Sequence, residues 1–341
     1  MTTAGAGASA PDQPGAGQLR ATGPQTQDPI LTVTLNPALD LATSAARVVP
    51  ELKLRCDAPL VDPGGGGINV SRAIDRMGGR STAFVALGGP TGARNESLIR
   101  ETGLDLVRMD TPGDTRQSLS VTDRETGGQY RFVLPGPDWT DHEVAAALQT
   151  IAGAVPDRGL VVLSGSNPPG VPAEFASLLA DHLRERSLRL VVDTSGAALA
   201  AVATARGAPV TVLRMDAAEA EALFGSSLSM RADTAGFARA LAASGAAEAV
   251  IIARGADGNI IATADGSWHA EAAPVTVVSK VGAGDSFVGG FALAMARGWD
   301  APDALALGAA AASATCLTPA TELCHAVDVE RLFAQRVVTP I

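Results

Sequence analysis

The residues with the clearest chemical potential form the segment Val281-Gly282-Ala283-Gly284-Asp285-Ser286, which leads into an apolar stretch typical of a helix. Small residues let backbone amides converge at a helix N-terminus, where the helix dipole also favours anions. Such amides could stabilise the charge on a transferring phosphoryl group, and Asp285 could accept the proton of an attacking hydroxyl. The alternative is that Asp285 only caps the helix.

A run of glycines forms a second candidate site, Pro63-Gly64-Gly65-Gly66-Gly67-Ile68-Asn69-Val70. Glycines that run into a helix let a ligand approach the backbone closely, and Asn69 in the first turn could hydrogen-bond hydroxyl groups. The run lacks the Gly-Lys-Ser/Thr of a Walker A loop and the glycine spacing of a dinucleotide fingerprint. A hinge that binds no ligand is the alternative.

A third candidate is Asp40, in the segment Asn36-Pro37-Ala38-Leu39-Asp40 that follows the first expected strand. Ligands of open α/β sheets bind at strand ends, so Asp40 could hydrogen-bond a sugar hydroxyl. An aspartate in this position can equally belong to a simple turn.

Composition limits the partners of such sites. The formal net charge of −10 argues against nucleic acid, so a phosphorylated substrate would need a local cluster of cations. No apolar run reaches the ~20 residues that span a membrane, so no membrane partner is expected. Three cysteines without metal-ligand spacing indicate a reducing, cytoplasmic location, and four scattered histidines argue against a histidine-based metal site.

Short apolar runs alternate with Ala/Leu-rich stretches of helical spacing along the chain. Buried strands are expected at 30–35, 83–87, 160–163, 188–192 and 249–252, and helices at 141–153, 173–186 and 235–245. This alternation predicts βαβ units, hence an α/β fold whose parallel sheet is covered on both faces.

Two segments depart from that alternation. Residues 116–134 alternate around the turn Glu125-Thr126-Gly127-Gly128 and predict a β-hairpin, and residues 41–62 contain another extended stretch. We expect the two to form a small inserted β-sheet, with segments at about 41–64 and 115–135, that acts as a lid or a dimer surface. Residues 1–28 read as a disordered tail before a single domain at 29–341.

Taken together, the motifs resemble those of the PfkB group of ribokinase-like sugar kinases, across roughly residues 30–335. The markers occur in the family's order: N-P-A-L-D, K-L-R-C, G-G-G-G-I-N-V, T-R-Q-S, Q-Y-R-F-V-L-P-G, S-G-S-N-P-P-G, D-T-S-G and V-G-A-G-D-S. The resemblance implies a three-layer α/β/α core with a mostly parallel sheet and a β-sheet lid through which homodimers form.

The resemblance also implies roles for individual residues. Asp285 matches the catalytic base, and the anion hole falls on Gly282, Ala283 and Gly284. Sugar-contacting positions are Asp40, Gly65, Gly66 and Asn69, with Ser166 in the sugar-phosphate pocket. Lys53, Arg55 and Arg116 fall on basic lid positions that meet the sugar phosphate or bridge to nucleotide, although a solvated strand face is the alternative for these three.

The nucleotide half departs from the family pattern. Where the family has K-P-N-x-x-E, the chain has Arg214, Asp216 and Glu219, with Asp216 and Glu219 expected to hold Mg²⁺ through water. Where the family has S-L-G-x-x-G, the serine is replaced by Ala253. The remaining nucleotide positions are Gly255, Gly258 and Ser279.

The stretch 318–322 replaces one whose carbonyls hold a monovalent cation in the family. It has Glu322 at an arginine position, so a requirement for K⁺ stays open.

The expected reaction is transfer of phosphate from ATP to the 1-hydroxyl of fructose 6-phosphate. The glycine run lacks the lysine usual in fructose-1-phosphate and tagatose-6-phosphate kinases, which favours the 6-phosphofructokinase branch of the family. Those two kinase activities are the first alternative. A non-catalytic sugar-phosphate sensor on the same fold is the second, because the nucleotide half is altered.

Overall fold

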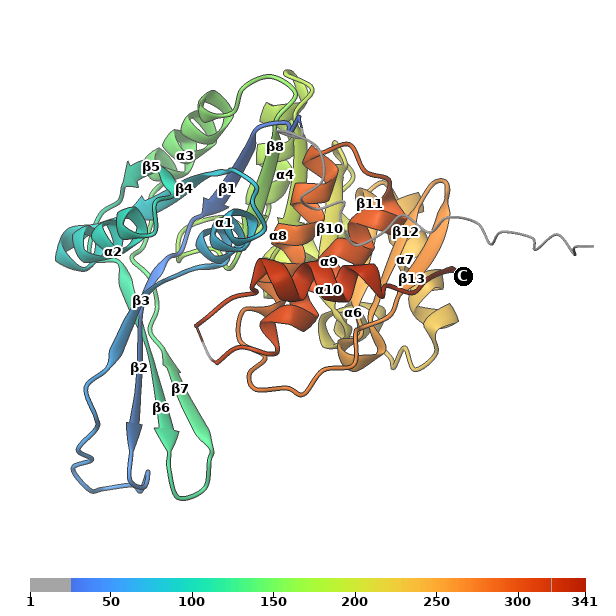
Figure 1. The fold of residues 1–341 in the computed structure, drawn as a ribbon. Coiled ribbons are helices and arrows are strands. Elements are labelled where there is room, and N and C mark those ends of the chain that lie inside the picture. Colours follow the sequence, from blue (N-terminus) through green and yellow to red (C-terminus); the bar gives the residue numbers. More distant parts are fainter. Residues whose placement is uncertain (1–25, 320) are drawn as a thin grey trace, which may run out of the picture.

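A computed structural model describes residues 26–319 and 321–341. Within these residues the main feature is a ten-stranded sheet in the order β14-β13-β12-β11-β10-β9-β8-β1-β4-β5 (Figure 1). The strands from β11 to β5 in this order run parallel: β1 (Ile30–Thr34), β4 (Thr82–Leu87), β5 (Asp105–Asp110), β8 (Leu160–Ser164), β9 (Arg189–Asp193), β10 (Val210–Asp216) and β11 (Ala247–Ala253). Antiparallel strands extend one edge: β12 (Asn259–Thr263), β13 (Gly266–Ala270) and β14 (Val338–Pro340).

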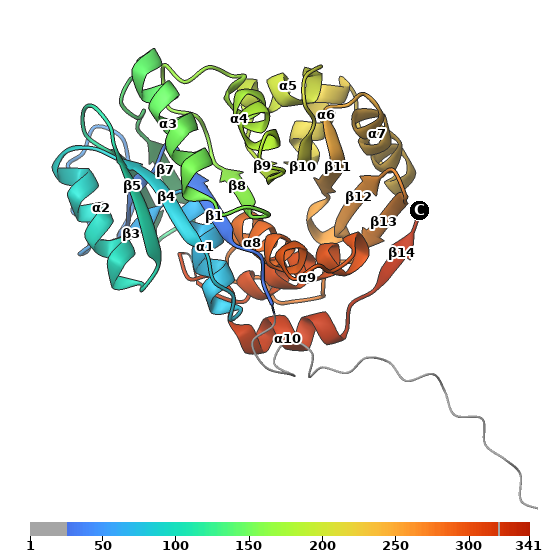
Figure 2. The same cartoon turned by 90° about the horizontal axis from the view of Figure 1, so that it is seen from above.

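Helices cover both faces of this sheet (Figure 2). One layer contains α1 (Gly66–Arg76), α2 (Gly89–Glu101), α8 (Ala283–Ala296), α9 (Ala301–Thr315) and α10 (Ala326–Ala334). The other contains α3 (Asp141–Ala154), α4 (Phe175–Arg184), α5 (Gly196–Thr204), α6 (Ala217–Phe224) and α7 (Arg231–Ala243). The predicted three-layer α/β/α core is confirmed.

The central strands β4 and β8 are apolar along nearly their whole length, and both of their faces are buried. In β8, Val161 and Leu163 pack with the α3–α7 layer, whereas Leu160 and Val162 pack with the α8–α10 layer. Continuous apolar runs of this kind are typical of parallel strands sandwiched between helices.

A second sheet is inserted between these elements, as predicted, and projects away from the core (Figure 1). We call it the lid sheet; its strands are β2 (Ala38–Ala45), β3 (Leu60–Gly64), β6 (Arg116–Asp123) and β7 (Gln129–Val133), in the order β3-β2-β6-β7. β2 pairs in parallel with β6, and the other pairs are antiparallel. The Asp123 carboxylate accepts the amides of Glu125 and Thr126, which closes the predicted hairpin turn.

The carboxyl ends of the parallel strands share one edge of the main sheet, where ligands of open α/β sheets bind. The lid sheet starts at this edge, because β2 follows β1 directly. Most of the predicted N-terminal tail, residues 1–25, lies outside the described residues. Across the part of the chain that is described, no helix combines the length and apolar character needed to cross a membrane.

Candidate active site

Asp285 lies in the first turn of α8 and does not cap the helix. The cap is Gly282, which has φ 79° and ψ 0°, and no side chain caps the helix. Glycine suits this left-handed conformation. The Asp285 carboxylate instead accepts a hydrogen bond of 2.9 Å from the side-chain amide of Asn69 in α1. Asp285 is therefore held at the helix N-terminus without using the amides that a substrate oxygen would need.

The environment of Asp285 favours its protonated form. Burial, followed by the nearby Asp193 carboxylate, raises the pKa of Asp285 to about 7 from its ordinary value of 3.8. The Asn69 hydrogen bond and the Arg214 charge oppose this rise. A carboxylate with a pKa close to physiological pH is well matched to general-base catalysis.

This pKa predicts the acid limb of the activity profile. Only ionised Asp285 can accept a proton, so kcat/KM should fall tenfold per pH unit below about pH 7 and level off above it. Initial rates in constant-ionic-strength buffers between pH 5 and 9 test this. A limb centred near pH 4 would mean that another group, or an unshifted carboxylate, limits the reaction.

An ion pair lies next to the first turn of α8. It joins Arg214, in β10, to Asp193, at the end of β9. The Nη1–Oδ1 distance is 2.9 Å, and the two side chains are 15% and 13% exposed. A Cβ on Gly284 would lie 3.4 Å from Arg214 Nη2, so the guanidinium packs against the anion-hole segment. Arg214 therefore lies beside Asp285 and the expected phosphate position, as a side chain already paired with a carboxylate.

The glycine run brings α1 close to the end of β8. A Cβ on Gly66 would approach the Ser164 hydroxyl within 2.4 Å, so only glycine fits there without a shift. Gly64 lies against Asp40 in the same way, because a Cβ there would lie 2.2 Å from a carboxylate oxygen of Asp40 and would displace that side chain. The structure thus brings Asp40 and the glycine run together.

Asp40 lies on the face of the lid sheet that carries cations. Burial raises the pKa of the Asp40 carboxyl, while Arg116 and Arg131 act against the rise. Arg116 in turn donates to the backbone carbonyl of Asn36, at 3.2 Å. A carboxyl group and a guanidinium therefore lie near each other where β1 passes into the lid sheet.

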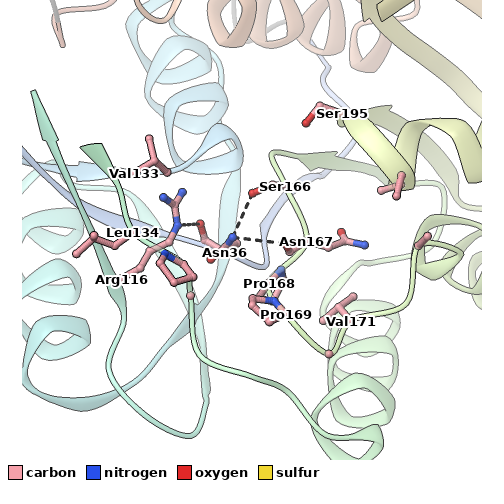
Figure 3. Close-up of a pocket in the computed structure, with 16 residues that line it drawn as sticks. Asn36, Arg116, Val133, Leu134, Ser166, Asn167, Pro168, Pro169, Val171 and Ser195 are labelled. Carbon is pink, nitrogen blue, oxygen red and sulfur yellow. Dashed lines mark hydrogen bonds between the residues drawn. The ribbon is translucent and has the colours of Figure 1, made fainter. Parts of the chain in front are cut away.

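A cavity of about 620 Å³ opens beside these residues and is lined by Arg116, Asn36 and Ser166 (Figure 3). The Asn36 side-chain amide donates to the Ser166 hydroxyl at 3.1 Å. The wall of the cavity continues along Pro168, Pro169 and the start of α5 at Ser195. One guanidinium with two polar side chains can orient a phosphate group.

Lys53 and Arg55 are not brought to this cavity. They lie in the connection between β2 and β3. The neighbouring residue Cys56 pairs through its backbone, in an isolated antiparallel β-bridge, with Ala45, the last residue of β2. The cavity adjoins the other end of β2, at Ala38. The eight residues from Ala38 to Ala45 span ~23 Å of extended strand, too far for a side chain to reach back.

On the nucleotide side, Asp216 and Glu219 form a capping box at the start of α6, in which each side chain accepts the other's backbone amide. Burial, together with the Asp216 charge, raises the pKa of Glu219. In the described residues, no three His, Cys, Asp or Glu side chains converge on a point that could hold a metal. Two adjacent carboxylates fit a Mg²⁺ ion held mostly by water and phosphate, not an all-protein cage.

The other nucleotide-side positions lie along the same edge of the sheet. Ser279 accepts the Val281 amide at 3.2 Å, and Gly255 and Gly258 flank the turn after β11. The Thr318 hydroxyl donates within the loop to the carbonyls of Thr315 and Glu322. Ala320 of that loop lies outside the described residues.

Four residues of the site were not assigned from the sequence: Asp193, Arg131, Asn36 and Arg72. Arg72 donates to the side-chain oxygen Oδ1 of Asn69 at 3.4 Å, which orients the side-chain amide that holds Asp285. Asp193, Arg131 and Asn36 lie inside the motifs that resemble those of the sugar-kinase family. Their place in these motifs was the sequence feature that could have identified them as site residues.

An α/β/α core with an inserted β-sheet and a carboxylate at a helix N-terminus defines a ribokinase-like sugar kinase, which transfers phosphate to a hydroxyl group. The sequence profile of the pfkB family of carbohydrate kinases matches residues 34–327. The chain therefore belongs to the pfkB family of carbohydrate kinases.

Known relatives agree with this assignment. The chain is 40% identical over 304 residues to the ATP-dependent 6-phosphofructokinase isozyme 2 of Mycobacterium tuberculosis, covering 89% of this chain and 88% of that one. It is 36% identical over 305 residues to the enzyme of the same name from Escherichia coli, covering 89% and 98%. With the 1-phosphofructokinase of Bacillus subtilis it shares 29% identity over 289 residues, covering 85% and 93%.

Solved structures of the Escherichia coli phosphofructokinase-2 superpose on the fold. The complex with potassium has a TM-score of 0.85 at 35% identity, covering 90% of this chain and 99% of that one. The tetrameric inhibited form of that enzyme has a TM-score of 0.83 at 34% identity, with the same coverage.

Proposed function

We propose that this chain transfers the γ-phosphate of ATP to the 1-hydroxyl of fructose 6-phosphate, giving ADP and fructose 1,6-bisphosphate in the cytoplasm. The observation that carries the proposal is Asp285, held by Asn69 at the N-terminus of α8 with a pKa raised to about 7. The relatives named 6-phosphofructokinase support this sugar over fructose 1-phosphate, because they share more of the sequence.

In the proposed reaction, Asp285 removes the proton from the attacking hydroxyl. The amides of Gly282, Ala283 and Gly284 stabilise the charge on the transferring phosphoryl group. Asp40, with Asn69 and the backbone of Gly65 and Gly66, holds the sugar hydroxyls. Arg116 and Ser166 receive the 6-phosphate in the 620 Å³ cavity that they line.

ATP is proposed to lie along the edge formed by Arg214, Asp216, Ser279 and the Gly255–Gly258 turn. Mg²⁺, when bound, would neutralise the charge on the β- and γ-phosphates, with Asp216 and Glu219 holding its water ligands. K⁺ is part of one Escherichia coli complex. The Thr318 hydroxyl bonds to two carbonyls of the corresponding loop here, and the K⁺ requirement of this chain stays open.

Homodimerisation through the lid sheet would complete the site. Large apolar side chains are exposed on this sheet and its connections: Leu52, Leu60, Tyr130, Phe132, Val133 and Leu134. An exposed apolar surface of this kind is typical of an interface. A second copy across it could deliver the Arg55 side chain that cannot reach the cavity of its own chain.

A mixing experiment tests delivery of Arg55 from the partner. Arg55→Ala and Asp285→Asn are each expected to have ~1% of wild-type activity or less alone. After subunit exchange, activity should return to roughly a quarter of wild type, because half of the dimers are mixed and each has one intact site. Arg47→Ala serves as the control, since Arg47 lies on the same connection but pairs with exposed Glu125. No recovery in the mixture would mean that Arg55 acts within its own chain.

The substrate is tested by a panel assay of ADP release with fructose 6-phosphate, fructose 1-phosphate and tagatose 6-phosphate. We expect kcat/KM for fructose 6-phosphate to exceed the other two by ~10-fold or more. A higher value for fructose 1-phosphate or tagatose 6-phosphate would replace the proposed substrate.

A further inference from the structure

The turn that follows β11 is tied to the connection between α6 and α7 by one arginine. This turn, Gly255–Asp257, is a short 3₁₀ helix closed at Gly258, and Arg254 stands directly before it. The Arg254 side chain is 14% exposed, with Nε 2.7 Å from the Asp257 carboxylate. Its Nη atoms donate to the carbonyls of Leu228 and Ser229, at 2.8 and 2.9 Å, and to the Thr234 hydroxyl.

A second arginine strengthens the same link. Arg231, the first residue of α7, donates to the other oxygen of the Asp257 carboxylate from Nε at 3.0 Å and from Nη2 at 2.5 Å. The hydrogen bonds from Arg231 and Arg254 lower the pKa of Asp257 to about 2, so this carboxylate is ionised at any pH where the protein works. Charge-assisted bonds to a planar guanidinium fix geometry better than neutral ones do.

The geometry assigns Arg254 a positioning role. Each of its three guanidinium nitrogens already donates to a protein oxygen, which leaves little capacity to bind phosphate. The turn that it holds adjoins the nucleotide-side residues, because Ala253 pairs with Asp216 across β11 and β10. Gly258 in this turn has φ 104°, and a Cβ there would approach the Ala270 carbonyl within 2.1 Å.

We propose that Arg254 and Asp257 form a clip that holds the Gly255–Gly258 turn in its nucleotide-binding shape before ATP arrives. The inference rests on the proposed function, in which this turn forms a wall of the nucleotide site. A loop that is ordered during folding loses less entropy on binding, so the clip strengthens ATP binding without touching ATP. It also accounts for an arginine at a position where the family pattern has leucine.

The test compares Arg254→Leu with the wild type by calorimetric titration of Mg-ATP in the absence of sugar, and by steady-state kinetics. We expect the Kd and KM for ATP to rise ~10-fold, with kcat and the KM for the sugar phosphate within about twofold of wild type. Arg239→Leu is the matched control, because Arg239 is a part-buried arginine of α7 that bonds Ser267 outside the clip. It should leave ATP binding unchanged.

Unchanged ATP affinity in Arg254→Leu would overturn the clip. Changes in ATP binding, kcat and the KM for the sugar phosphate that all follow the fraction of folded protein would overturn it too. If Arg254→Leu does not fold, Asp257→Asn decides by the same criteria, since it keeps one hydrogen-bond acceptor for Arg254. A wild type that binds no Mg-ATP would overturn the proposed function itself. Equal affinities of the wild type and Arg254→Leu for Mg-ATP would overturn only the clip.

Discussion

Replacing Asp285 with asparagine is expected to lower kcat by ~10²–10⁴-fold while the KM values for ATP and the sugar phosphate change little. Asparagine keeps the size of the side chain and can still accept the bond from Asn69, but it cannot take a proton from the attacking hydroxyl. The loss should therefore appear in the chemical step. Single-turnover and steady-state rates measure it.

The same variant should be more stable than the wild type, and the difference should depend on pH. Asp285 has a folded pKa of about 7 against an ordinary 3.8, so its favourable contribution is complete below pH 3.8 and lost as pH rises through 7. An uncharged asparagine avoids this loss, so the Tm gain should grow between pH 4 and 7 and then level off.

The exposed turn residue Asp265 provides the control, because Asp265→Asn should alter neither rate nor Tm. Near-normal turnover in Asp285→Asn would remove Asp285 from the role of base. A Tm difference that is flat between pH 4 and 8 would mean that its carboxylate is not destabilised in the fold.

Asp193→Asn is expected to lower the free energy of unfolding by about 3 kcal/mol, because it removes the hydrogen-bonded counter-charge of the buried Arg214 guanidinium. The amide oxygen of asparagine can still accept one hydrogen bond, which places the loss at the low end of the range for broken buried pairs. Denaturant unfolding of both proteins measures the difference.

This substitution should also move the pH profile. Asp193 raises the pKa of Asp285 and Arg214 lowers it, so removing the Asp193 charge shifts the acid limb of kcat/KM to lower pH. Asp181→Asn, in an exposed pair with Arg184, should change neither stability nor profile. Wild-type stability together with an unmoved limb would show that the Asp193–Arg214 pair does not act on Asp285.

The core was predictable from the sequence because apolar period and length specify buried strands and the helices between them. Strands β8, β9 and β11 and helices α3, α4 and α7 lie where the pattern placed them, within a few residues at each end. The antiparallel edge, β12 to β14, was not predicted. Short edge strands such as Gly266–Ala270 depend on pairing with a neighbour and carry little periodic signal of their own.

The candidate site was only partly predictable. The motifs indicated Asp285 and the glycine run, but Asp285 alone could not be told from a helix cap without the φ of Gly282 and the bond from Asn69. The Arg214–Asp193 pair joins the ends of two strands, and such a contact depends on strand order, which local sequence does not encode. Strand pairing also separates Arg55 from Arg116, since they lie near opposite ends of β2, and the local sequence does not show this pairing.

The central claim is that this chain phosphorylates the 1-hydroxyl of fructose 6-phosphate, and ³¹P NMR of the reaction mixture tests it most directly. With wild-type protein, Mg-ATP and fructose 6-phosphate, we expect a new phosphate ester at carbon 1 to appear in step with ADP, and to form at least ~10²-fold more slowly with Asp285→Asn. Binding of fructose 6-phosphate without any new ester at millimolar Mg-ATP would contradict the claim and indicate a sugar-phosphate sensor.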